Sequence, residues 1–425
     1  MSALAQAARW REAAPRLTLW PVIEAGLALS ALLLYSNALL APLLADPARP
    51  DDAEALRLIW PPVYALTLIL ITLSPGAVWR VAMRSWPLIL LGVLTMVSAL
   101  WSLDPEVSVR RGLGVVMTLA FGLWLAARYD WRDLIRLIAL TFSILAVGSL
   151  LAGALAPGFG VMQEVHPGAW RGLWWEKNTL GAMMAWGALA FLAAAFSAKT
   201  QGERWVWLAL IPLALALVVL ATSRTAFIAT GIAVGGPVAI ALVRRGFGFA
   251  SVGVLGLVCG VIGAGFVAVI GPGAVLELLG RDATLTGRTD IWIALGDAIA
   301  QRPWTGFGYG AFWEVDNGPV HWVRQTTAWP VPTAHNAWLE TALALGIPGT
   351  ALAGWVYLAG LGRSAGRLFQ GVETYWALPF LAAWGVISLS ESNLLQQNGF
   401  VWLLLSVTLA KLAAGRDQAW RAETP

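Results

Sequence analysis

One stretch decides the fold: WVWLALIPLALALVVLATSRTAFIATGIAVGGPVAIALV, which runs from Trp205 to Val243. It contains two apolar runs, near 205–222 and 225–243, and each is about long enough to cross the ~30 Å hydrocarbon core of a bilayer as a helix. Only the letters TSRT separate the runs. The stretch therefore predicts a tight hairpin of two membrane-spanning helices with Arg224 at its tip.

Comparable apolar runs recur along all 425 residues, of which 58% are hydrophobic and only 12% are charged. A lipid-facing backbone must satisfy its own hydrogen bonds, and alternating strand patterns are absent, so the runs predict helices. We expect an all-α, polytopic membrane protein that forms one domain over residues 1–425, with about 12 transmembrane helices. The expected spans lie near 19–43, 58–74, 86–101, 113–127, 134–155, 178–197, 205–222, 225–243, 249–271, 335–361, 374–389 and 398–414.

The distribution of basic residues predicts the orientation. With the N-terminus inside, most Lys and Arg fall on short inner loops, whereas the outer loops carry most of the acids, which is the positive-inside pattern. Both termini are therefore expected in the cytoplasm, and the net charge of +4 reflects topology without suggesting nucleic-acid binding. The inner basic residues are Arg9, Arg11, Arg16, Arg80, Arg84, Arg128, Arg132, Arg136, Lys199, Arg204, Arg244, Arg245, Arg363, Arg367, Lys411, Arg416 and Arg421.

A long outer loop, 272–334, separates the ninth and tenth expected spans. Its many aromatic residues predict a structured loop, although aromatic residues at headgroup depth are also typical of membrane interfaces. Within it, RTDIWIALGDAIAQ (288–301) has the pattern of a short amphipathic helix with Asp290 near its start. The following RPWTGFGYGAFW (302–313), which includes Tyr309, predicts a tight aromatic turn.

Basic residues on the outer side indicate an anionic partner. Arg224 at the hairpin tip and Arg288 before the amphipathic helix present donor forks that suit phosphate oxygens. A snorkelling Arg224 bound to headgroup phosphate is the alternative interpretation. In WRGLWWEKNTLGAM (170–183), the candidate substrate contacts are Arg171, Lys177 and Asn178, and ordinary flanking positions are again the alternative.

His335 is the candidate general base, because a neutral imidazole accepts a proton near neutral pH. It precedes Asn336, a further candidate substrate contact, where the tenth span enters the membrane. The alternative is a histidine that caps the helix N-terminus. His335 and Glu340 are five residues apart and share no helix face well, so we expect no metal site and no cofactor. The outer arginines and the histidine together fit transfer from a lipid diphosphate donor, with the arginines stabilising the departing charge.

The ordered motifs TSRTAF, LTGRTDIW, RPWTGFGYGAFW and AHNAWLE with LGIPG resemble the O-antigen ligase and Wzy-type polysaccharide polymerase superfamily. RGLWWEKNTLG looks most like its exopolysaccharide polymerase branch. The resemblance covers roughly Arg171 to Gly349 well and the remaining spans by topology. It implies a GT-C-like, metal-independent glycosyltransferase in the bacterial inner membrane, with its active site facing the periplasm.

The implied donor is a glycan linked to undecaprenyl diphosphate, and the implied roles are diphosphate contact for Arg224 and Arg288 and acceptor activation for His335. A polymerase would extend a lipid-linked repeat unit, whereas a ligase would use lipid A-core, and the motifs do not separate the two. Membrane lipids, a flippase and a chain-length regulator are the expected partners. A lipid-linked oligosaccharide transporter is the alternative of another class, but transporters place ionisable groups near the bilayer midplane, and here the unusual polar groups lie at outer helix ends.

Overall fold

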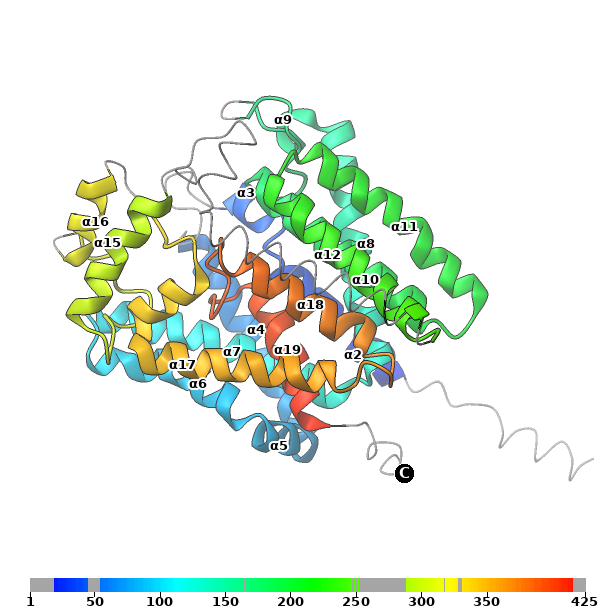
Figure 1. Ribbon diagram of the computed structural model, residues 1–425, viewed down its shortest axis with the longest axis horizontal. Helices are drawn as coiled ribbons and strands as arrows, with labels where there is room; N and C mark the ends of the chain where they lie inside the picture. The colour runs from blue at the N-terminus through cyan, green and yellow to red at the C-terminus, as the bar shows by residue number, and fades with distance from the viewer. Residues whose placement is uncertain are drawn as a thin grey trace, which may run out of the picture.

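The computed structural model describes residues 19–44, 54–163, 166–246, 248, 249, 251, 288–316, 318–327 and 331–415. Within these ranges the secondary structure is helical, apart from one isolated antiparallel bridge between Val161 and Trp170, which confirms the all-α prediction for this part of the chain. The helices are α2 (Leu19–Tyr35), α3 (Leu40–Leu44), α4 (Glu54–Thr72), α5 (Pro75–Arg84), α6 (Trp86–Val97), the short 3-10 helix η1 (Ser98–Leu100), α7 (Pro105–Arg128), α8 (Trp131–Leu155), α9 (Pro157–Gly160), α10 (Lys177–Ser197), α11 (Gln201–Leu220), α12 (Arg224–Val243), α15 (Arg288–Gln301), α16 (Pro319–Thr327), α17 (Ala337–Ala365), α18 (Thr374–Ile387) and α19 (Phe400–Ala414) (Figure 1).

Among the described residues, 6 helices are long and apolar enough to cross a membrane: α7, α8, α10, α11, α12 and α17. Four shorter apolar helices, α2, α6 with η1, α18 and α19, occupy other expected spans. These helices support a multi-pass membrane protein. The span expected near 249–271 falls almost entirely outside the described residues, as do 272–287 of the outer loop, so the total of about twelve spans stays a prediction.

The second expected span, near 58–74, is followed directly by another helix in a new direction. Leu58–Thr72 and Pro75–Arg84 are two helices bent by 99° across Leu73 and Ser74. Arg80 and Arg84, which the sequence predicted on an inner loop, lie on the helix α5. Pro75 at the first position of α5 has no backbone N–H to donate, which allows a new helix to start there in a new direction.

The core includes the packing of α7 against α19 and of α10 against α18. Trp186 on α10, Trp384 on α18 and Trp402 on α19 are fully buried. A Cβ at Gly122 of α7 would lie only 3.1 Å from Ser406 Cβ of α19, so the missing side chain allows this close approach. The hairpin of α11 and α12 is peripheral. In the most apolar 18-residue segments of these two helices, 22% and 28% of the residues are buried, against 83% in α10.

The hairpin prediction is confirmed: three residues, 221–223, connect α11 to α12. The backbone reverses through Thr222, which adopts a positive φ of 50°. Arg224 is the first residue of α12, as the sequence indicated, while its side chain lies outside the described part of the structure.

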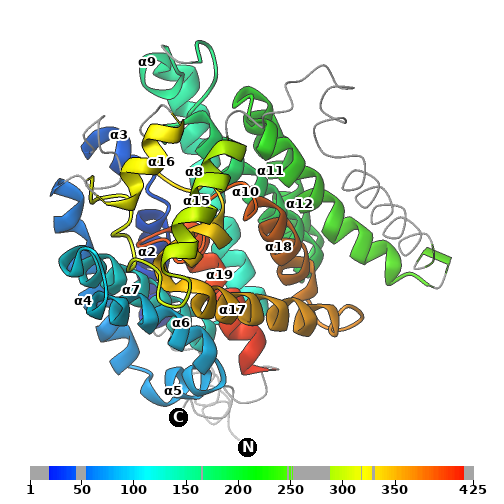
Figure 2. The ribbon, with the colours of Figure 1, turned by 60° about the vertical axis from the view of Figure 1, so that its left-hand side comes forward.

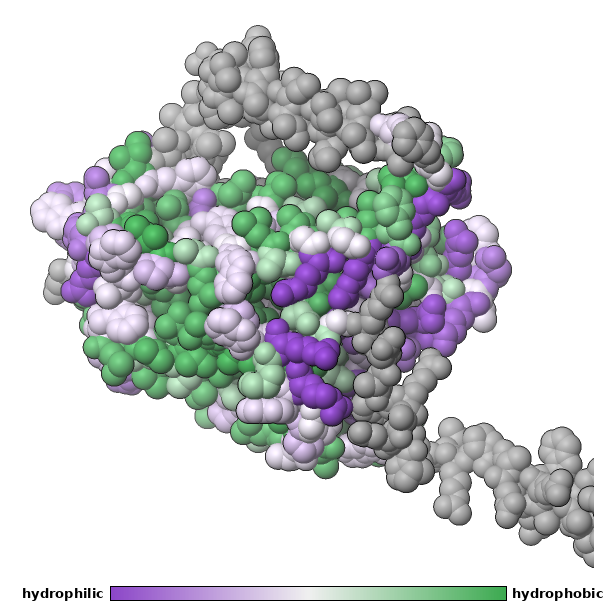
Figure 3. Space-filling model, turned by 60° about the horizontal axis from the view of Figure 1, so that its bottom comes forward, coloured by the Kyte–Doolittle hydropathy of each residue, from purple (hydrophilic) through white to green (hydrophobic). Residues whose placement is uncertain are grey.

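Basic residues gather at the end of the bundle that carries α5, which lies at the bottom of Figure 2. Arg84 Nη1 donates to the carbonyl of Ala414, the last residue of α19. Arg132 Nε donates to the carbonyl of Ser197, the last residue of α10, at 2.7 Å. Because helix C-termini leave carbonyls without helical partners, these cations satisfy acceptors that would otherwise need water. Figure 3 shows hydrophilic residues concentrated beside a broad hydrophobic surface.

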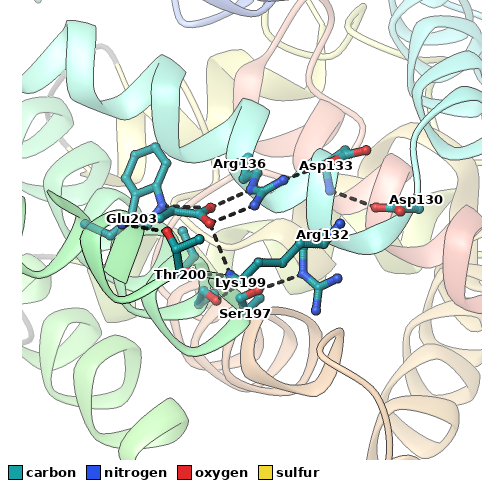
Figure 4. Close-up of polar contacts among 11 residues, drawn as sticks. Asp130, Arg132, Asp133, Arg136, Ser197, Lys199, Thr200 and Glu203 are labelled. Atoms are coloured by element: carbon teal, nitrogen blue, oxygen red, sulfur yellow. Dashed lines mark hydrogen bonds and ion pairs between the residues drawn. The ribbon is translucent and has the colours of Figure 1, made fainter. Parts of the chain in front are cut away.

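A polar network joins the start of α8 to the connection between α10 and α11 (Figure 4). Arg136 binds Glu203 through two contacts, Nε to Oε1 at 2.5 Å and Nη2 to Oε2 at 2.7 Å. The backbone N–H of Lys199 donates to Oε2 of the same carboxylate at 3.1 Å. Two parallel hydrogen bonds fix the relative orientation of the guanidinium and the carboxylate. They therefore hold α8 against the start of α11.

The opposite end carries a small folded unit with its own hydrophobic core, which we call the loop unit: residues 288–316, 318–327 and 331–334. Ile291 and Leu295 of α15 pack with Phe307, Phe312 and Val320 in a cluster separate from the main core. The predicted helix over 288–301 is confirmed with the same bounds, whereas α16 was not predicted. α15 packs against α17, which attaches the loop unit to the bundle (Figure 2).

Candidate functional site

The aromatic turn of the loop unit docks by its backbone onto a break in α17. Phe307 N donates to the carbonyl of Leu343 at 2.7 Å, and Gly308 N donates to the carbonyl of Ala344 at 3.1 Å. These carbonyls are available because α17 is interrupted at Gly346, which has a non-helical φ of 69° and ψ of −173°. A Cβ on Gly308, itself at a φ of 91°, would lie 2.2 Å from Ser102 Oγ, so only glycine fits this position.

Tyr309 fastens the same turn to the α6–α7 region and to the connection before α19. Its N–H donates to Ser98 Oγ at 2.9 Å, and its carbonyl accepts from Ser108 Oγ at 2.9 Å. Its hydroxyl donates to the carbonyl of Leu395. Burial raises the pKa of the Tyr309 hydroxyl well above its usual range, which keeps the proton on this donor. These contacts position the aromatic turn, and the substrate contact expected for Tyr309 from the sequence stays a prediction.

His335 lies in a strained backbone conformation that neighbouring residues hold in place. Its φ is 47°, in the left-handed region that few residues other than glycine occupy. Before it, Ala334 N donates to Glu340 Oε2 at 2.8 Å, and the carbonyl of Ala334 accepts from Trp292 Nε1 at 3.0 Å. His335 N itself donates to Thr333 Oγ1 at 3.3 Å. Strain of about 1–3 kcal/mol persists only where the surroundings enforce it, as they do here.

Asn336 caps α17. Its side-chain oxygen accepts from the N–H groups of Trp338 at 2.9 Å and Leu339 at 3.1 Å. Its Nδ2 donates to the carbonyl of Leu389 at 3.2 Å, and its backbone N–H donates to Ser392 Oγ at 3.3 Å. Asn336, and not the preceding His335, is therefore the N-cap residue of α17, and the general-base role and the substrate contact predicted for these two residues stay predictions. The side chain of Asn336 is committed to helix capping and to the segment that follows α18.

Glu340, in the first turn of α17, was missed as a site residue because only its spacing from His335 was weighed. Its carboxylate accepts from Trp313 Nε1 at 2.6 Å, from Ala334 N at 2.8 Å and from Ser392 Oγ at 3.4 Å. It thus joins the aromatic turn, the segment before His335 and the segment after α18. An acidic residue in an apolar span was the available sequence signal, since such residues are rarely incidental.

The start of α15, where Arg288 lies, contacts the residue next to His335. Arg288 is the first residue of that helix, and Trp292, one turn later, makes the hydrogen bond to Ala334. Asp290 lies in this first turn and is exposed. The side chain of Arg288 lies outside the described part of the structure, so its predicted pairing with Asp290 and its aim at a phosphate stay predictions.

Arg224 is brought to the same end of the bundle by the antiparallel packing of α12 on α18. Midway along both helices, a Cβ on Gly236 would lie 2.7 Å from Pro379 Cβ. Beyond the far end of α12, Arg244 Nη2 donates to the carbonyl of Gln370, which precedes α18, at 2.8 Å. The start of α12 therefore lies toward the end of α18, where the segment from Ser388 to Ser392 meets the start of α17.

The third predicted cluster also reaches this end. Lys177 Nζ donates to Oγ1 of Thr222 at 3.3 Å and to its carbonyl at 3.4 Å, which ties the start of α10 to the hairpin tip. Asn178 is exposed beside it. Arg171 instead donates to the carbonyl of Phe159 at 2.7 Å and lies 6.0 Å from the ring centre of Trp175. These contacts hold the segment before α10, and they do not join Arg171 to the elements around His335.

The elements that carry Arg224, Arg288, His335, Lys177 and Asn178 thus converge on one end of the bundle, opposite the basic end. The convergence is of backbone elements, and the substrate contacts and catalytic roles predicted for these side chains stay predictions. In the part of the chain that the structure describes, no three His, Cys, Asp or Glu side chains gather as a metal-binding group.

Comparisons with known proteins agree with the motif order. Residues 208–354 match the O-antigen ligase family, and this segment includes Arg224, Arg288 and His335. The chain is also similar to the exopolysaccharide production protein ExoQ of Rhizobium meliloti (strain 1021), with 28% identity over 233 residues. That alignment covers 52% of this chain and 51% of ExoQ, so it spans about half the length of each protein. The match and the relative confirm the resemblance to the O-antigen ligase and polysaccharide polymerase superfamily.

Proposed function

We propose that the protein is a glycosyltransferase that polymerises a polysaccharide from lipid-linked units at the outer face of the bacterial inner membrane. The observation that carries the proposal is the contact of Trp292 with Ala334, which places the helix that begins at Arg288 against the residue next to His335. A cation-bearing helix start beside a histidine suits a reaction in which an anion departs and a hydroxyl attacks.

In the proposed step, the hydroxyl of a lipid-linked repeat unit loses its proton to the imidazole of His335. Its oxygen forms a bond to the anomeric carbon of the donor glycan, while the bond from that carbon to the diphosphate oxygen breaks. The electron pair leaves with the undecaprenyl diphosphate. Arg224 and Arg288 stabilise the negative charge that develops on the leaving group, as fixed cations do in sites with little water.

The enforced backbone at His335 supports this assignment. A general base works only when it is held within hydrogen-bond reach of the proton it takes. The hydrogen bonds of the Ala334 and Asn336 backbone N–H groups fix the chain on both sides of His335. A backbone held in this way reduces the entropy lost when the imidazole reaches the reactive geometry.

Polymerisation is favoured by the similarity to a protein named for exopolysaccharide production. Transfer to lipid A-core is the second candidate, favoured by the match of residues 208–354 to the O-antigen ligase family. A transporter would not release the lipid carrier, so release of undecaprenyl diphosphate separates both enzymatic candidates from transport.

The experiment uses the purified full chain in detergent with synthetic lipid-linked repeat units, without ATP or an ion gradient. We expect longer glycans and one undecaprenyl diphosphate released per bond formed, with an unchanged rate in EDTA because the arginines supply the positive charge. In a parallel reaction, lipid A-core is the acceptor, and transfer there in place of chain growth would identify a ligase. Absence of carrier release in both reactions would refute the proposal.

Substitutions test the roles. Arg224→Lys and Arg288→Lys should each lower kcat, because a point charge does not reproduce the donor fork of a guanidinium. His335→Ala should abolish transfer while donor binding persists. Full activity in both lysine variants would contradict diphosphate contact, and wild-type turnover in His335→Ala would remove the base from the mechanism.

A further inference from the structure

A second polar site lies at the bend between α4 and α5, at the end of the bundle opposite the loop unit. A cavity of about 100 Å³ is present there. It is bounded by α2, by the bend and by the last turns of α7. Two of its lining residues, Trp20 and Leu73, are 45% and 58% exposed, so the cavity lies at the protein surface. The remaining lining residues are Glu24, Leu70, Ser74, Trp124 and Arg128.

Glu24 is the unusual member of this lining. It is only 4% exposed, although it lies in an apolar helix that is expected to enter the membrane. Its Oε1 accepts from Arg128 Nε, whereas its buried Oε2 has no hydrogen-bond partner among the described residues. A buried acceptor without a hydrogen bond is destabilising, and more so when it is charged, so a donor that entered the cavity and bonded to Oε2 would stabilise the protein.

The residues that line the cavity indicate which chemical group could donate to Glu24. A carboxylate oxygen without a donor, next to the indole rings of Trp20 and Trp124, suits a cation that carries N–H groups, since indole faces attract cations. Arg128 beside it already balances the charge of Glu24. A ligand that brought only positive charge would leave an excess, whereas one that carries an ammonium and a phosphate adds no net charge.

The surroundings point to a lipid as the source of such a ligand. α5 leaves the bend at 99° to α4, with Val78 and Val81 buried, Trp79 64% exposed and Met83 47% exposed. Together with its two arginines, this pattern is typical of a helix that lies in the membrane interface. Headgroups at that depth are therefore next to the cavity.

We propose that the bend between α4 and α5 binds the headgroup of an aminophospholipid. The primary ammonium donates to Glu24 Oε2 between the two indoles, and the lipid phosphate lies toward Arg128. A trimethylammonium headgroup has no N–H to donate and is bound less well. The bound lipid ties α2, α4 and α7 together at the end of the protein farthest from the loop unit, so it stabilises the fold without taking part in glycan transfer.

The test places the purified full chain in nanodiscs whose anionic fraction is constant and whose zwitterionic lipid is phosphatidylethanolamine, its monomethyl or dimethyl derivative, or phosphatidylcholine. The melting temperature and the lipid retained after gentle delipidation are measured. We expect both to fall stepwise as N–H groups are replaced by methyl groups, with several-fold more phosphatidylethanolamine than phosphatidylcholine retained. Equal values across the series would overturn the proposal and indicate that only water fills the cavity.

Glu24→Gln is the matching variant. It keeps an acceptor for Arg128 but presents an amide N–H where Oε2 accepts, so the preference for phosphatidylethanolamine should disappear. Asp133→Asn is the control, because Asp133 is an exposed carboxylate at the same end and pairs with Arg136 at 3.2 Å. The lipid preference should survive in this control. A preference retained in Glu24→Gln would refute the assignment, and the wild-type lipid series decides the question even if that variant does not fold.

Discussion

Replacing Glu340 by glutamine tests whether the hydrogen bonds that hold the backbone next to His335 are needed for glycan transfer. The carboxylate accepts one N–H donor on each oxygen, Trp313 Nε1 at 2.6 Å and Ala334 N at 2.8 Å. Glutamine has nearly the same shape but retains a single acceptor oxygen. In either orientation of the amide, its NH₂ group faces one of the two donors, and that donor loses its partner.

The magnitude follows from these contacts. Leaving one buried donor unsatisfied costs about 1–3 kcal/mol. Where the donor is Ala334 N, the energy that holds the left-handed conformation of His335 falls by a similar amount. At 1.36 kcal/mol per factor of ten, a loss of this size in the reactive arrangement lowers kcat by about 5- to 150-fold. Donor KM should change less than kcat, since the hydrogen bonds of Glu340 go to Trp313, Ala334 and Ser392, which do not belong to α12 or α15.

The assay is the initial rate of carrier release with purified protein, measured beside the melting temperature. Glu314→Gln is the matched control: the same substitution in the loop unit, at a partly exposed carboxylate that pairs with Arg111 at 2.6 Å. Such exposed pairs contribute about 0–1 kcal/mol, so this control should keep most of its activity. Wild-type kcat in Glu340→Gln, or an equal loss in both variants, would refute the reasoning.

Three further substitutions probe the frame around the site. Gly308→Ala should abolish stable docking of the aromatic turn, because its Cβ would overlap Ser102, and limited proteolysis should then cut the loop unit; resistance equal to wild type would contradict this. Asn336→Ala should lower stability by about 1 kcal/mol through loss of the cap, and Asn336→Asp, which restores the acceptor, should recover most of it in thermal melts. Lys411→Met should lower the melting temperature because the carbonyls of Ala126 and Tyr129 lose a buried donor, yet donor KM should stay unchanged; a selective KM effect would show coupling between the two ends of the bundle.

Local patterns in the sequence predicted the elements that local physics determines. The bounds of α15 follow from the periodicity of RTDIWIALGDAIAQ, and the α11–α12 hairpin follows from two apolar runs with only TSRT between them. The helix α5 was missed because the residues after the expected span 58–74 include Arg80 and Arg84, which favoured an inner loop. The break at Gly346 has a signal in the sequence, because Pro348 interrupts the expected tenth span, whereas the docking of the aromatic turn at that break depends on packing.

In the candidate site too, the sequence indicated some residues and left out those that depend on long-range packing. His335 and the two arginines stood out because ionisable residues are rare in this chain. Glu340 did not, because its partners are Trp313 and Ser392, which lie 27 and 52 residues away along the chain. No spacing rule connects such residues, and only the packed arrangement of α17, the aromatic turn and the segment after α18 brings them together.

The docking of the aromatic turn has a consequence for biogenesis. The turn is made after its partners Ser98 and Ser108 but before the others: the carbonyls of Leu343 and Ala344 belong to a helix synthesised later, and that of Leu395 to a segment synthesised later still. A nascent chain folds from its N-terminus as it emerges, so the N–H groups of Phe307 and Gly308 stay hydrated until α17 has been made. Closure of the end of the bundle that carries the loop unit is then a late event of assembly, and under the proposed function a chain that stalls before α17 would remain inactive.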